Sequence, residues 1–368
     1  MQDLARMRLL IVAGKGGVGK TTTSAAVALQ LAKSGRKTLL VTVDPAKRLE
    51  DSLGVPVGPE PTAVQPNLKA MMLDPSAIIK EHLEERLPQA KVTEHPLFRY
   101  VTNYLPGLNE LMAIGRLNDF RRAGTYDCIV VDTAPTGHAL SFLAAPQGIR
   151  DMMKEGSLLK WAVRGYAVWQ RMASTASKVG NVFRREEDRK RAPPDIDFEK
   201  VFGEIREEAE RIQEFLSDPQ HSRLLLVTLP EKLPVEETID LHKAVEELGF
   251  HVHVVVVNKV QPDPLAGHAE RFKELENASA RRSFTTKAAE ATGDDPALFG
   301  ALLAAAEFGQ VRREMNLAYI ADLQARLPQV PTVRMPLFKE DVQGLKRLKE
   351  FSAVLFDPAN QEKATASP

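Results

Sequence analysis

The 368-residue sequence contains a single cysteine, Cys128. One cysteine excludes a disulfide within the chain and any metal site built from several thiolates of one chain. No apolar run approaches the roughly 20 residues that a membrane-spanning helix needs, so we expect no integral membrane protein. Because 49 basic residues balance 49 acidic ones, the composition does not favour nucleic acid or an anionic membrane as partner. MQDLARMRLL leads directly into the first apolar run, so we expect no signal peptide and a cytoplasmic location.

The strongest motif lies in the segment from Leu9 to Ala32, where an apolar run, a glycine-rich turn and a helix-forming stretch follow one another. The turn fits the pattern G-x-x-x-x-G-K-[ST], in which backbone N–H groups surround phosphate oxygens at a helix N-terminus. Lys20 would reach the outer phosphates, and the Thr21 hydroxyl would bind magnesium. A plain glycine-rich turn is the alternative. The expected nucleotide-binding residues are Gly14, Lys15, Gly16, Gly17, Val18, Gly19, Lys20, Thr21 and Thr22.

Each of two later apolar runs leads to an aspartate. Asp44 follows the run Lys37–Val43, and Asp132 is the last residue of the run Tyr126–Asp132. Asp44 is placed to orient water or magnesium at the end of a parallel strand, or it caps the next helix. Asp132 fits the Walker B position, whose carboxylate holds magnesium, usually through water; a helix cap is its alternative. His138 lies just beyond and is either a switch-loop residue or an ordinary packed or exposed histidine.

Further strands are expected at Leu224–Thr228, Val252–Val257 and Thr332–Leu337, with helices between them. This pattern predicts an α/β fold with a mostly parallel sheet flanked by helices. Residues 146–215 interrupt the alternation. We therefore expect one discontinuous core domain over residues 1–145 and 220–358, an inserted helical subdomain over residues 146–219, and a disordered tail over residues 359–368.

The inserted segment carries methionine and aromatic residues at helical spacing, including both tryptophans, Trp161 and Trp169. Such a stripe forms a groove for apolar partners, or it packs on a neighbouring helix or across a dimer. Asn258 follows a strand, where its amide could read a nucleotide base or simply terminate the strand.

The phosphate loop GKGGVGKTT has a second lysine, Lys15, directly after its first glycine. This deviant Walker A form resembles that of the dimeric P-loop ATPases, which include the arsenite-pump (anion-transporting) and tail-anchored-protein-targeting ATPases. VDPAKRLEDSLG resembles their first switch, with Lys47 where histidine is usual, and VVDTAPTGHAL resembles their second. LPGLNEL, VVVNKV and MPLFKEDVQG also fit, so the resemblance covers nearly the whole chain and implies a P-loop NTPase fold.

The resemblance implies a role for each matching residue. Lys20 and Thr21 would bind phosphate and magnesium, and Lys15 would reach across a dimer to the partner's nucleotide. Asp44 would position the attacking water, and Asp132 would hold magnesium. The adenine would be flanked by Asn258, Pro336, Leu337 and Phe338. Lys15, Lys20 and Asp44 are the expected catalytic residues, with ATP and Mg²⁺ as cofactors and a second copy or a paralogue as partner.

The sequence differs from the family in two ways that bear on zinc and arsenite binding. The chain lacks the C-x-x-C pair that shares zinc across a dimer, so no zinc is expected, and it lacks the three cysteines that bind arsenite. We expect an ATP-gated dimer that handles an apolar client protein. One alternative is the peripheral ATPase subunit of a membrane transport system for an anion or other solute, though not for arsenite bound through cysteines, with a membrane-associated partner. A second is a regulatory ATPase of the partition and positioning type.

Overall fold

The computed structural model describes residues 4, 6–43, 48–74, 77–78, 81, 107–133, 136–152, 198–265 and 267–362. Asp44 and Lys47 lie outside these ranges, as do Trp161 and Trp169. His138 belongs to a described helix, but its side chain is not described.

A twisted sheet of nine strands forms the centre of the described chain, in the order β3-β4-β2-β5-β1-β6-β7-β8-β9. The seven strands from β4 to β8 pair in parallel, and the two edge pairs are antiparallel. The inner strands are continuous apolar runs because both faces of the sheet are covered. The strands are β1 Leu9–Gly14, β2 Thr38–Thr42, β3 Thr62–Gln65, β4 Leu68–Met72, β5 Cys128–Asp132, β6 Ser222–Thr228, β7 Val252–Val260, β8 Thr332–Pro336 and β9 Gln361–Glu362.

Alternate residues of the strands belong to two separate apolar layers, as the period of two in a strand requires. In β1, Leu9 and Ile11 face one layer, whereas Leu10 and Val12 face the other. The first layer is completed by α5 Leu108–Arg122, α6 Thr136–Met152, α9 Phe198–Ser217, α10 Lys232–Glu247 and the end of α13 Pro296–Arg326. The second is completed by α1 Lys20–Lys33, α2 Arg48–Leu53 and α14 Gly344–Phe356. The expected parallel α/β fold is confirmed.

The helices on either side of the inserted segment belong to the first layer rather than to a separate body. α6 continues through Pro146 to Met152, and α9 buries Ile212 and Phe215 in the same layer. The division of the chain at residues 146 and 219 therefore stays a prediction, because the segment between these helices lies outside the described ranges.

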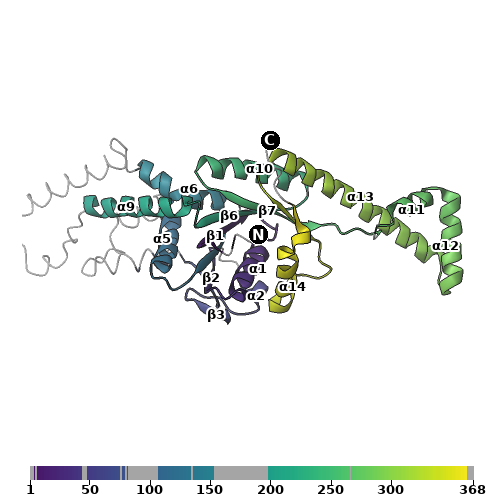
Figure 1. Cartoon of the computed structure of the whole chain (residues 1–368), viewed down its shortest axis with the longest axis horizontal. Coiled ribbons are helices and arrows are strands. Elements are labelled where there is room, and N and C mark those ends of the chain that lie inside the picture. The colour runs from purple at the N-terminus through teal and green to yellow at the C-terminus, as the bar shows by residue number, and fades with distance from the viewer. Residues whose placement is uncertain are drawn as a thin grey trace, which may run out of the picture.

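A helical arm leaves the sheet after β7 (Figure 1). Its parts are α11 Ala269–Lys273, the 3-10 turn η3 Glu274–Glu276, α12 Ala278–Thr292 and the first half of α13. The long helix α13 begins at Pro296 behind an Asp295 N-cap. Arg281 on α12 pairs with Glu307 on α13 at 2.6 Å and joins the two helices. Among the described helices, none is both long and apolar enough to cross a membrane.

The end of the described chain also differs from the expectation. Residues 359–362 were expected in a disordered tail, but Pro358–Asn360 form the 3-10 turn η4 and β9 pairs with β8. The reason is that β8 would otherwise be the edge of the sheet, and an edge strand offers unpaired backbone groups to a neighbouring segment.

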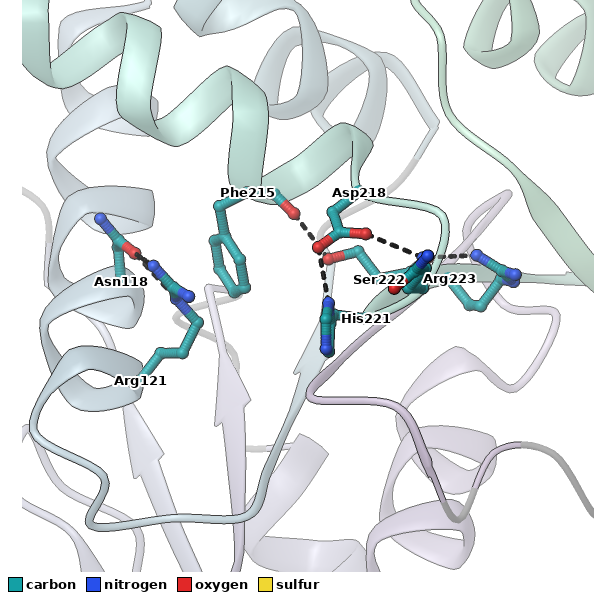
Figure 2. A network of polar contacts seen from close by, with 8 residues as sticks. Asn118, Arg121, Phe215, Asp218, His221, Ser222 and Arg223 are labelled. Carbon is teal, nitrogen blue, oxygen red and sulfur yellow. Dashed lines mark hydrogen bonds and ion pairs between the residues drawn. The ribbon is translucent and has the colours of Figure 1, made fainter.

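A polar network lies at the amino-terminal ends of the parallel strands (Figure 2), whereas the phosphate loop lies at their carboxyl ends. Arg121 on α5 lies over the Phe215 ring of α9, with 4.5 Å between guanidinium carbon and ring centroid. Asp218 Oδ2 contacts His221 Nδ1 at 2.6 Å, and Ser222 Oγ donates to the Phe215 carbonyl. Partial burial raises the pKa of Asp218, but the hydrogen bonds from His221 and Gln220 lower it more, so its net pKa is below the ordinary value. The network joins α5, α9 and β6.

Cys128 gives a direct probe of this core. It is the first residue of β5, fully buried, and burial raises the pKa of its thiol to about 12. Because only the thiolate reacts, we expect no labelling of folded protein by Ellman's reagent at pH 8, and one thiol labelled per chain in denaturant. Fast labelling of the native protein would show that β5 is not the central strand described here.

Candidate active site

The phosphate loop joins the end of β1 to the start of α1, and two of its glycines are required by close approach. A Cβ at Gly14 would lie 2.2 Å from the Val227 carbonyl oxygen of β6, which is backbone and cannot give way. A Cβ at Gly19 would lie 2.3 Å from Asn258 Nδ2, and Gly19 also has φ +99°, which favours glycine. The loop is therefore held closely against β6 and β7, while Gly17 has no neighbouring atom within 4 Å of its Cβ position.

Lys20 begins α1 and lies folded over this loop. Its side chain is buried, and its Nζ donates to the Lys15 carbonyl oxygen at 2.9 Å. Thr22 follows in the first turn of α1. The ammonium of Lys20 thus already lies within the loop that would surround a phosphate chain, which is the arrangement that a phosphate-binding lysine requires.

Thr21 and Asp132, which are 111 residues apart, meet in the same site. Thr21 Oγ1 donates to Asp132 Oδ2 at 2.8 Å, and Asp132 is buried. The sheet register explains this contact, because Asp132 lies beside Val12 of β1 and Thr42 of β2. The Thr42 hydroxyl approaches the same oxygen at 3.4 Å.

These oxygens fit a magnesium ion that accompanies a nucleotide. Mg²⁺ takes oxygen ligands, keeps several waters and is usually held by one or two carboxylates together with substrate phosphates. Among the described residues, no group of three or more His, Cys, Asp or Glu could form a complete protein cage for a metal. One hydroxyl and one carboxylate beside a phosphate loop are therefore the donor set that a nucleotide-borne magnesium requires.

Lys15 makes a contact that the sequence did not indicate. Its Nζ lies 2.8 Å from Glu237 Oε1 on α10, and each side chain is about one third exposed (35% and 33%). Lys15 is therefore paired within its own chain. A role across a dimer stays a prediction.

Asn258 supports the phosphate loop in this structure. Its Nδ2 donates to the Val18 carbonyl oxygen at 2.9 Å, and its Oδ1 accepts from the N–H of Lys259. Lys259 has φ +57°, uncommon for a residue other than glycine, and it lies where the pairing of β7 with β8 shifts register. This bulge places Asn258 beside the loop, 240 residues from Val18. A contact with the adenine stays a prediction.

The segment Pro336–Phe338 lies at the end of β8, next to Asn258 in the sheet. Leu337 N–H donates to the Val260 carbonyl oxygen at 2.8 Å, and its side chain is 43% exposed. Phe338 packs on Phe351 of α14, with ring centroids 5.4 Å apart. The structure therefore brings the expected adenine residues to neighbouring strand ends, with Leu337 facing solvent.

Known proteins similar to this chain are ATPases, which agrees with a phosphate-binding site. The family model described as anion-transporting ATPase matches residues 7–287. A protein named arsenical pump-driving ATPase from Chlorobaculum tepidum is 32% identical over 278 residues, which cover 73% of this chain and 65% of that protein. The chain thus spans slightly less than two thirds of that relative. ATPase GET3 of Mycosarcoma maydis is 28% identical over 359 residues, which cover 97% of this chain and 92% of the relative.

The variant Asn258→Ala tests whether Asn258 supports the phosphate loop or contacts the adenine base. Loss of the hydrogen bond to Val18 should weaken Mg-ATP binding by about 2- to 10-fold. It should weaken binding of inorganic tripolyphosphate, which has no base, by the same factor. Titration calorimetry measures both, with Asn316→Ala as control, because Asn316 bonds Gln261 and Pro230 away from the loop. Weaker ATP binding with unchanged tripolyphosphate binding would instead indicate a contact with adenine.

Proposed function

Because this chain belongs to the anion-transporting ATPase family, we propose that it is an ATP-driven dimeric switch. In this proposal Mg-ATP closes two copies against each other, and hydrolysis with phosphate release reopens them. The observation that supports the nucleotide site of this switch is the contact of Thr21 with Asp132 beside the buried Lys20. That hydrogen bond joins the phosphate loop to the acid at the end of β5.

The roles proposed for Lys20, Thr21 and Asp132 follow from their positions, and the role proposed for Asp44 follows from the resemblance of its segment to the family's first switch. Water attacks the γ-phosphorus, the bond to the ADP oxygen breaks, and Asp44 orients the water and accepts its proton. Lys20 neutralises charge on the outer phosphates. Thr21 and Asp132 are the residues that would hold Mg²⁺, which would supply positive charge to neutralise the charge that develops in the transition state.

A second subunit completes the site in this proposal. Lys15 is a further cation at the edge of the phosphate loop, and a cation supplied in trans stabilises charge in phosphoryl transfer as an arginine finger does. The chain carries one phosphate loop, so the partner is a second copy or a paralogue. Hydrolysis is then coupled to closure of the dimer.

We assign an apolar client protein to the segment between α6 and α9. Both flanking helices pack on the first apolar layer, so a movement of the core on nucleotide binding would be transmitted to the segment that they bracket. The methionines and tryptophans of that segment suit an apolar client. The cytoplasmic location stays a prediction.

A peripheral role in transport is the second candidate, because the family description and the name of the Chlorobaculum relative both refer to it. A metalloid site of cysteine thiolates does not fit this chain, whose one thiol is buried in β5 with its pKa raised to about 12. A transported solute would have to be recognised by other groups, or by the membrane partner.

Asp44→Asn tests the proposed switch. The amide cannot accept a proton from water, so we expect ATP binding near the wild-type level and turnover reduced by at least about 100-fold. ATP should then leave the variant as a stable dimer, measured by sedimentation velocity. Asp51→Asn is the matched control, since Asp51 is an exposed acid in the nearby helix α2.

The outcomes of this experiment separate the candidate functions. Normal turnover by Asp44→Asn would refute the catalytic assignment, and a variant that stays monomeric with ATP would refute the dimer. Proteins that co-purify with the trapped form distinguish the roles. Soluble or membrane-inserted apolar clients support targeting, whereas a transporter subunit supports the transport role.

A further inference from the structure

The ion pair between Lys15 and Glu237 links the phosphate loop to α10. Lys15 Nζ lies 2.8 Å from Glu237 Oε1, while Glu237 Oε2 is buried and has no hydrogen-bond partner. Glu237 lies in the early turns of α10, directly after the strand β6 that packs against Gly14. The carboxylate therefore holds the Lys15 ammonium at the edge of the loop, within one subunit.

This position conflicts with a role in trans. A contact of the Lys15 ammonium with the phosphates of a nucleotide in another subunit would compete with its 2.8 Å contact with Glu237, because both draw on the same positive charge. A triphosphate carries several negative charges, so it can compete with a single carboxylate for the ammonium. Closure of the dimer would then transfer Lys15 from Glu237 to the partner's nucleotide.

We propose that Glu237 is a positioning residue that retains Lys15 in its own subunit until the nucleotide-bound dimer closes. The inference rests on the proposed dimeric function, because it gives Lys15 its role in trans. It adds a residue outside the phosphate loop and both switches. Because closure breaks the pair, the pair weakens association of the nucleotide-bound subunits.

The expected change in the dimer dissociation constant depends on how exposed the ion pair between Lys15 and Glu237 is. An ion pair as exposed as this one shifts an equilibrium by up to about fivefold. A symmetric dimer breaks two such pairs on closing, so the dissociation constant should change by up to about 25-fold. The effect should shrink in high salt, because partly exposed charges are screened.

The test compares Glu237→Gln with wild type in sedimentation velocity, using Mg²⁺ and the non-hydrolysable analogue AMP-PNP. We expect the variant to form the dimer at a 2- to 25-fold lower protein concentration. Glu236→Gln is the matched control, since the neighbouring Glu236 pairs with Arg326 on α13 instead. In a Lys15→Ala background, Glu237→Gln should have no effect, which a merely structural role would not predict. Equal or weaker association of Glu237→Gln would overturn the proposal.

A second measurement uses the nucleotide-free protein and does not depend on association. Lys15 is acetylated with a limiting amount of acetic anhydride and quantified by peptide mass spectrometry relative to the exposed Lys33. Acetylation of Lys15 should increase in Glu237→Gln and stay unchanged in Glu236→Gln. No increase would show that Glu237 does not hold Lys15. If Lys15 acetylation increases but wild type never dimerises with nucleotide, the proposed function fails and the contact stands.

Discussion

The hydrogen bond from Thr21 to Asp132 depends on the register of three parallel strands, and the rest of the site is arranged around it. Asp132 ends β5, and the phosphate loop follows β1, so pairing of Val12 with Asp132 brings loop and acid together. A shift of β5 by one residue would turn the carboxylate to the opposite face of the sheet. Burial of alternate strand residues in two apolar layers fixes this register. The packing that fixes the strand register therefore also positions Asp132 beside the phosphate loop.

Both lysines of the loop contact groups of their own chain in this structure. Lys20 donates to a carbonyl oxygen of the loop, whereas Lys15 pairs with a carboxylate from another helix. The difference in partner matters, because a neutral carbonyl competes weakly with phosphate and a carboxylate competes more strongly. In the proposed function, Lys20 would exchange its carbonyl for phosphate within one subunit, whereas release of Lys15 would require a further event. Closure of a dimer would be such an event.

The local motifs could be predicted from the sequence, but the contacts between distant segments could not. The phosphate loop and the strand ending at Asp132 are recognisable because glycine spacing and apolar runs are local signals. Glu237 is one acid among many in an amphipathic helix, and nothing in its surroundings indicates Lys15, 222 residues away. The sequence predicts only that Asn258 reads a nucleotide base or ends a strand. Its contact with Val18 depends on a bulge that the sequence does not reveal.

The central claim is that two subunits complete one nucleotide site, and mixing two inactive variants tests it most directly. Lys15→Ala retains its own phosphate loop, and Lys20→Ala retains the lysine that acts in trans. If Lys15 acts across the dimer, random mixing makes half of the dimers mixed, each with one complete site of two. ATPase activity should then recover to about a quarter of the wild-type rate per subunit. A mixture with no more activity than the sum of its two components would contradict the account.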